Sequence, residues 1–144
     1  MNMSRVALAA VVAWVVDGVY GFAVYGKALE GEFARYPGVF RPMEAVMGNL
    51  PLMFAGGLVA MFAVAYIYAK GYEGGSGVQE GLRFGILMAV FLVGYVLVGN
   101  YVVMNVGRRI SAYMAVAGVV EWIVVGITLG IVYKPVAAGK TVHV

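Results

Sequence analysis

The stretch ALAAVVAWVVDGVYGFAVYGK, residues 7–27, decides the class of this protein. It is apolar almost throughout, and its one acidic residue, Asp17, lies twelve residues after Arg5 and ten before Lys27. At about 1.5 Å per helical residue, Asp17 is ~18 Å from one charged end and ~15 Å from the other. That depth is close to the middle of a hydrocarbon layer roughly 30 Å thick. Because an acid is costly to hold there, its presence predicts a functional site.

A second acid, Glu121, occupies the same depth of another apolar run. It lies twelve residues after Arg109 and thirteen before Lys134, and neither run contains Lys, Arg or His to neutralise its acid. If the two runs are adjacent helices, the two carboxyls approach each other. We therefore expect at least one of them to be protonated at neutral pH, because removal from water and a like-charged neighbour both disfavour the charged form. That carboxyl would donate a hydrogen bond to a carbonyl, to Asn100 or to a tyrosine such as Tyr95.

Composition extends this interpretation to the whole chain. The 144 residues are 63% hydrophobic and 12% charged, with a mean hydropathy of +0.92. These values are typical of a polytopic membrane protein and leave no length for a soluble domain. The predicted fold is all-α, a single domain over residues 1–144 that forms an antiparallel bundle of four transmembrane helices. The predicted spans cover about residues 5–25, 43–68, 82–106 and 110–133.

Small residues recur on the predicted helices at positions where backbones can approach closely. In lipid no hydrophobic driving force pulls helices together, so close packing at such positions holds a bundle. Ala13 and Gly21 flank Asp17 at four-residue spacing, which predicts that Asp17 points into the bundle. The predicted packing residues are Ala13, Gly21, Gly56, Gly57, Gly85 and Gly118.

Amides and arginines gather where the third predicted span ends and the second begins. We interpret them as one polar cap at the same end of the bundle, held by interhelical amide bonds and by arginines that reach the headgroups. A ligand site is the less favoured alternative. The residues of this predicted cap are Asn49, Asn100, Asn105, Arg108 and Arg109.

Several kinds of chemistry have no residues to support them. The chain has no cysteine, and its single histidine, His143, lies in a short polar tail, so we expect no metal site and no haem. The glycine-rich segment 71–77 lacks the following Lys-Ser or Lys-Thr of a phosphate-binding loop. No nucleophile–base pair is evident, so we expect no enzyme, no cofactor and no nucleic-acid partner.

Three phrases carry a family resemblance: YGFAVYGK at 20–27, GLRFG at 81–85 and NYVVMNVGR at 100–108. Together with the spacing of Gly126 and Gly130, they resemble the small bacterial membrane proteins of the domain-of-unknown-function 1761 family. The resemblance implies a four-helix membrane fold. It implies no established chemistry, and so it assigns no catalytic residue.

The glycine stripes and scarce polar chemistry favour a non-enzymatic structural or accessory subunit, in a homo-oligomer or a larger membrane complex. The alternative is a small transporter or proton-coupled carrier that uses Asp17 and Glu121. We expect a multi-pass protein of the inner (plasma) membrane, in contact with lipids and other membrane subunits. Five Lys or Arg residues fall on each side, so the positive-inside rule does not orient the chain. The free amino terminus favours cytoplasmic termini.

Overall fold

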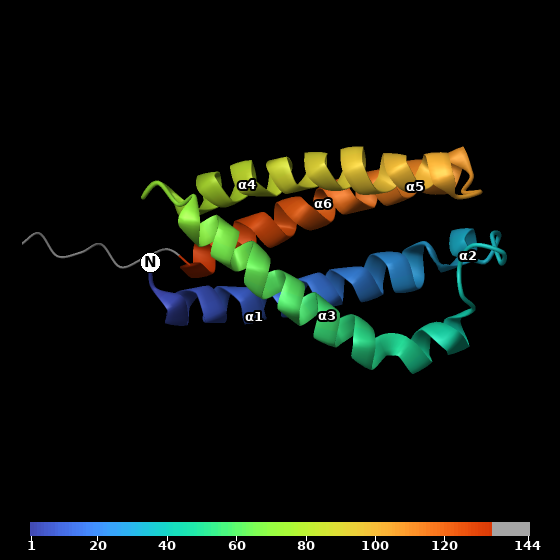
Figure 1. Cartoon of the computed structure of the whole chain (residues 1–144), viewed down its shortest axis with the longest axis horizontal. Coiled ribbons are helices and arrows are strands. Elements are labelled where there is room, and N and C mark those ends of the chain that lie inside the picture. Colours follow the sequence, from blue (N-terminus) through green and yellow to red (C-terminus); the bar gives the residue numbers. More distant parts are fainter. Residues whose placement is uncertain (134–144) are drawn as a thin grey trace, which may run out of the picture.

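The computed structural model describes residues 1–133, which fold as a bundle of long helices (Figure 1). Four of its helices are long and apolar enough to cross a membrane, and they span Met3–Ala28, Met43–Lys70, Gly77–Val103 and Arg108–Tyr133. The predicted all-α, four-helix membrane fold is therefore confirmed. Helices suit this setting because all their backbone polar groups pair within the segment, where lipid offers no partners.

Two of the four spans include a π-helical stretch. The first span is α1 (Met3–Ala23) followed by η1 (Val24–Ala28), and the third is α4 (Gly77–Phe91), η2 (Leu92–Leu97) and α5 (Val98–Val103). The second span is α3 (Met43–Lys70) and the fourth is α6 (Arg108–Tyr133). A short helix, α2 (Glu30–Phe33), lies in the first connection.

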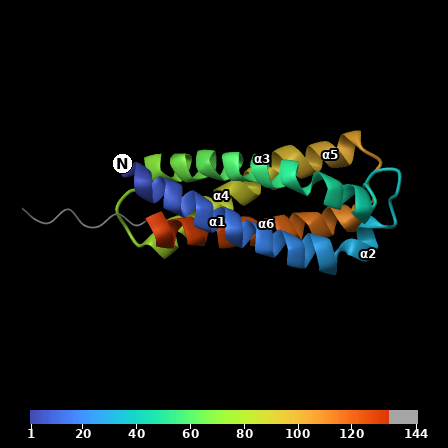
Figure 2. The ribbon, with the colours of Figure 1, turned by 90° about the horizontal axis from the view of Figure 1, so that it is seen from below.

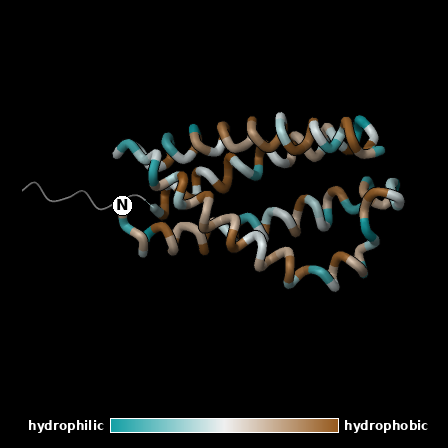
Figure 3. Tube along the Cα trace, viewed as in Figure 1, coloured by the Kyte–Doolittle hydropathy of each residue, from teal (hydrophilic) through white to brown (hydrophobic). Residues whose placement is uncertain are grey.

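Successive spans run in opposite directions, so the bundle has two distinct ends (Figures 1 and 2). The amino terminus, the α3–α4 turn and Tyr133 lie at one end, called here the termini end. The short helix α2 and the turn between α5 and α6 lie at the other, called here the α2 end. Hydrophilic residues are concentrated towards the two ends, with hydrophobic residues along the helices between them (Figure 3). This distribution matches a bundle that crosses the membrane lengthwise.

The closest helix pair is α4 with α6, and glycines make the contact. A Cβ atom added at Gly81 would collide with the Gly126 carbonyl, and one added at Gly77 would collide with the Gly130 carbonyl. The third level of the contact joins Gly85 to the carbonyl of Trp122. Backbones this close allow Cα–H···O contacts that side chains larger than hydrogen would exclude.

This contact also explains where the third span begins. The sequence predicts a start near residue 82, after a flexible turn, whereas α4 starts five residues earlier at Gly77. Gly77 and Gly81 are both buried against α6, so packing holds a helical turn that local sequence disfavours. Only Gly74, with φ of +91°, remains in the turn conformation that glycine alone adopts readily.

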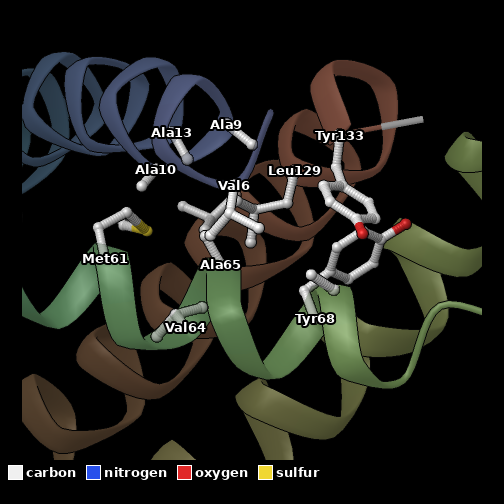
Figure 4. Packing of buried hydrophobic residues seen from close by; sticks show 12 residues of the cluster. Val6, Ala9, Ala10, Ala13, Met61, Val64, Ala65, Tyr68, Leu129 and Tyr133 are labelled. Atoms are coloured by element: carbon white, nitrogen blue, oxygen red, sulfur yellow. The ribbon is translucent and has the colours of Figure 1, made fainter. Parts of the chain in front are cut away.

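The apolar core lies in the termini half of the bundle and joins α1, α3 and α6 (Figure 4). Its best-buried side chains are small on α1 and larger on α6, so the alanines of one helix accommodate the side chains of another. Tyr133 makes edge-on ring contacts with Tyr68 and Tyr72 at the end of this core, and the rings of Tyr68 and Tyr72 meet at a tilt. The cluster comprises Val6, Ala9, Ala10, Ala13, Met61, Val64, Ala65, Tyr68, Ala69, Val125, Leu129 and Tyr133.

Helix α3 leaves this core in its first half. Its buried residues all lie between Met61 and Ala69, and residues 43–60 have none. Pro51 lies inside this half and cannot donate a backbone hydrogen bond to the preceding turn. In Figure 1 the start of α3 diverges from α4 and α5 towards the opposite side of the α2 end.

Candidate intramembrane acid site

Helix α1 presents Asp17 to α6 because the residues around it are small. Ala9 and Ala13, which lie two turns and one turn before it, are 1% and 0% exposed against the neighbouring helices. With no bulky side chain on this stripe, α1 lies close to α6 in the middle of the bundle, where Asp17 is half-buried. Asp17 thus points towards α6, into the bundle, as its spacing from small residues predicts.

The structure brings the two predicted acids together. The carboxyls of Asp17 and Glu121 lie close enough to interact directly, each near the midpoint of its span. Two carboxylates at this range repel, whereas a carboxyl and a carboxylate attract through one shared proton. The arrangement can therefore hold a proton between the two groups.

Two tyrosines complete the site. The Tyr25 hydroxyl donates a hydrogen bond of 2.8 Å to Glu121 Oε2, and the Tyr20 hydroxyl donates one of 2.8 Å to the carbonyl of Ala117. Their rings meet edge-on with centroids 6.3 Å apart. The sequence suggested a different tyrosine, Tyr95, as a partner. That prediction is wrong, because Tyr95 is 76% exposed and its ring stacks on Phe91.

Tyr25 lies in the π-helical turn η1, whereas Tyr20 precedes it in regular helix. Residues five apart in a regular α-helix point about 140° away from each other. In η1 the Leu29 amide bonds the Val24 carbonyl at 2.8 Å, a spacing of five residues, so the turn is wider than α-helical; both tyrosine hydroxyls bond groups of α6. Insertions of this kind are frequent at functional sites. Periodicity arguments assume a regular helix, so they miss Tyr25 as a site residue.

The second π-helical stretch also borders the site. Leu92, the first residue of η2, reaches α6 at Gly118, where an added Cβ would lie 2.7 Å from its side chain and 3.9 Å from the Tyr25 hydroxyl. Gly118, one of the predicted packing residues, thus makes room for side chains from two other spans, beside Glu121.

The other predicted packing residues differ in their surroundings. Ala13 is fully buried, Gly85 touches α6 as described, and Gly57 faces the Trp14 ring, 3.5 Å from a built Cβ. A Cβ at Gly21 would meet only the Tyr25 ring, at 4.0 Å, and one at Gly56 would meet nothing within 4 Å. Besides Gly85, the α4–α6 contact involves four glycines that were not among the predicted packing residues. These are Gly77, Gly81, Gly126 and Gly130.

The predicted polar cap is divided between separate partners. Asn49 donates to the Ala45 carbonyl of its own helix at 2.7 Å, and the start of α3 lies across the bundle from α5 (Figure 1). Asn100 lines a cavity of about 40 Å³ that also borders Ser111 and Tyr101. Asn105 is exposed.

The two arginines of the cap also have separate partners. Arg108 Nε donates to the Tyr101 hydroxyl at 3.3 Å. Arg109 pairs with Glu32 at 3.0 Å and lies over the Tyr113 ring, 5.5 Å from its centroid. No pattern in the sequence predicts a role for Glu32, whose side chain is only 13% exposed. It reaches Arg109 because α2 folds back over the end of the bundle.

Within residues 1–133, no group of three or more His, Asp or Glu side chains is placed to hold a metal ion. The predicted tail histidine, His143, lies outside the described residues. No family model, curated protein or solved structure matches this chain. The chemistry must therefore be argued from the site itself.

Proposed function

We propose that this integral membrane protein is a small, non-enzymatic, proton-coupled carrier whose Asp17–Glu121 pair binds the coupling proton. The observation that carries the proposal is the juxtaposition of two carboxyls from different spans at mid-depth. Buried acids in this position commonly serve as proton sites in membrane proteins, and a merely structural contact between helices does not require two of them.

The chemistry of the site supports a reversible proton exchange. In the protonated state one carboxyl O–H donates to the other carboxylate, and the pair carries one negative charge in place of two. On release, that O–H bond breaks and the proton passes to water, leaving two carboxylates. The Tyr25 hydroxyl, at 2.8 Å from Glu121, remains a donor to the charge that is exposed. It therefore limits the cost of the deprotonated state.

A test that needs no knowledge of the transported solute is charge movement after a pH jump. Proteoliposomes adsorbed on a solid-supported membrane should give a transient current when the pH drops, because the proton enters the low-dielectric interior to reach the pair. Asp17→Asn and Glu121→Gln should fold, since an amide replaces a neutral carboxyl closely, but each should abolish the transient. A wild-type signal no larger than that of protein-free liposomes, or an undiminished signal in both variants, would refute the proposal.

A second candidate function rests on a different observation. The first half of α3 has no buried residue, and it contacts α1 near Trp14, whose indole donates to the Phe54 carbonyl at 3.2 Å. This favours an accessory subunit that packs this half of α3 against another copy or another membrane protein. Purification in mild detergent should then yield a stable assembly larger than a monomer. A monomer that keeps its charge movement would argue against it.

We retain cytoplasmic termini in the plasma membrane as the proposed orientation. A reporter fused at residue 1 should be active only if it is cytoplasmic. The resemblance to the domain-of-unknown-function 1761 family implies the same architecture but adds no chemistry, so the proposed function does not depend on it.

A further inference from the structure

The acid pair lies between two unlike halves of the bundle. All buried residues of α1 precede Asp17, and every core residue of α6 follows Glu121. In the antiparallel arrangement, both groups lie towards the termini end. The two ends of the membrane therefore differ in how the protein separates them from the pair.

The termini half is tightly packed between Val6 and Asp17, and the open hollow of about 640 Å³ lined by Arg5, Lys70 and Tyr133 lies beyond Val6, at the end of the bundle. On α1 the buried stripe extends from Val6 to Ala13, and at about 1.5 Å per residue the distance from Val6 to Asp17 is ~16 Å. Leu129 is 0% and Val125 is 1% exposed on the facing helix. The hydroxyl-bearing residues of this core, Tyr68 and Tyr133, lie at its outer end, so only apolar side chains separate them from the acid pair.

The α2 half is less uniformly packed and carries polar groups. Beyond Asp17, residues 18–28 include no buried residue, and neither do η2 and α5, whereas α6 keeps Ile110, Ala117 and Gly118 buried in this half. The Tyr25 hydroxyl bonds Glu121 itself. The Tyr20 hydroxyl bonds Ala117, one turn of α6 closer to the α2 end. Looser packing around hydroxyl groups is what water requires to approach a buried acid.

Further polar groups continue towards the α2 end. The cavity of about 40 Å³ reaches α6 at Ser111 and Met114. A water molecule needs about 10–15 Å³ of such volume, so the cavity is large enough to hold water. Met114 is seven residues, or roughly 10 Å along the helix, from Glu121. The Glu32–Arg109 pair lies at the same end, beyond the cavity.

We infer that water and protons reach the Asp17–Glu121 pair from the α2 end alone, and that the buried core of the termini half is the closed side of the carrier. The proton part rests on the proposed function, whereas the access of water does not. The described conformation is thus open to the α2 end of the bundle. In a carrier, a second conformation open to the termini end requires the core around Val6 and Leu129 to separate.

The chain offers a matched test because it contains no cysteine. Ala13 and Gly21 lie four residues before and after Asp17, on the same face of the helix. Single variants Ala13→Cys and Gly21→Cys therefore place a thiol at similar distances on the two sides of the acid. Val19→Cys is the control for a thiol that faces lipid, since Val19 is 66% exposed on the outside of the bundle. Only a hydrated thiol ionises and reacts with a charged thiosulfonate that cannot cross the membrane.

We expect Gly21→Cys to react at least about tenfold faster than either Ala13→Cys or Val19→Cys in sealed vesicles. Labelling should occur only when the reagent is on the face that carries α2, as judged from vesicles of the two orientations. Size-exclusion profiles matching the wild type establish that each variant is folded, and labelling after denaturation establishes that each thiol is present.

Equal rates for Ala13→Cys and Gly21→Cys, absence of labelling at Gly21→Cys, or labelling from the termini face would each overturn the inference. The proposed function fails by a separate result, the absence of charge movement after the pH jump. A hydrated but proton-inactive site and a proton-active but sealed site are therefore distinguishable.

Discussion

Substitution of Gly81 by alanine tests the closest helix contact in the molecule. The added Cβ would collide with the Gly126 carbonyl oxygen and lie 2.9 Å from both the Gly126 carbonyl carbon and the Ile127 Cα. Carbon atoms pack at about 3.5–4.0 Å, so α4 and α6 would have to separate by roughly 0.5–1 Å. The neighbouring atoms are backbone and cannot rotate away.

The expected loss of unfolding free energy comes from the interhelical contacts that this separation weakens. The glycine contact has three levels, and Cα–H···O contacts are worth about 0.5–1 kcal/mol each, so weakening them costs roughly 1–3 kcal/mol. Alanine recovers about 0.5–1 kcal/mol through its helix propensity. We expect a net loss of about 1–2 kcal/mol for Gly81→Ala, which lowers the midpoint of thermal unfolding by roughly 3–8 °C for a chain of this length.

Gly56→Ala is the matched control, since it adds the same methyl group to a membrane-spanning helix. A Cβ at Gly56 meets nothing within 4 Å, so alanine should raise the unfolding free energy by up to about 1 kcal/mol. Reversible unfolding in mixed SDS micelles, followed by the fluorescence of Trp122 at the α4–α6 interface, measures both changes. The reasoning is refuted if Gly81→Ala is as stable as Gly56→Ala.

Two further predictions concern the polar groups. Tyr25→Phe should shift the infrared carboxyl band of the acid pair and slow the charge movement, because the 2.8 Å bond to Glu121 is lost; Tyr20→Phe, whose hydroxyl bonds a backbone carbonyl, should leave the band in place. Identical spectra for the two variants would exclude Tyr25 as a positioning residue. Arg109→Gln should lower the unfolding free energy only slightly, because its pairing with Glu32 is partly exposed. The loss should shrink at high salt in thermal unfolding measurements, and a salt-independent loss would show that the ion pair is not the cause.

The fold and the two acids were accessible from the sequence because both depend on depth in the membrane. Four apolar runs determine four spans whatever their detailed contacts, and counting residues from Arg5 and Arg109 places each acid at mid-depth. The four-residue spacing around Asp17 indicated its inward face, since regular helix geometry holds over Met3–Ala23.

The partners of these acids were not accessible, because they depend on departures from regular geometry. Tyr25 reaches Glu121 from within the π-helical turn η1, to which a regular 3.6-residue pattern does not apply. The pairing of Gly77 with Gly130 requires knowing that α4 and α6 are neighbours, and any of the 21 glycines has a similar local sequence signature. The assignment of Asn49 to the polar cap was wrong for another reason, since two residues at the same end of a bundle need not be neighbours.

The two faces of α6 explain why the acid pair is suited to couple proton binding to helix movement. Gly126 and Gly130 contact α4 through backbone atoms, and such an interface has no side chains that can rearrange. The face towards α1 meets it through side chains, including Leu129 in the core and Glu121 beside Asp17. Loss of the shared proton replaces an attraction with a repulsion at this second interface alone. By linkage, any arrangement of α1 on α6 that separates the two carboxyls must bind the shared proton less tightly, so proton occupancy and helix arrangement influence each other reciprocally.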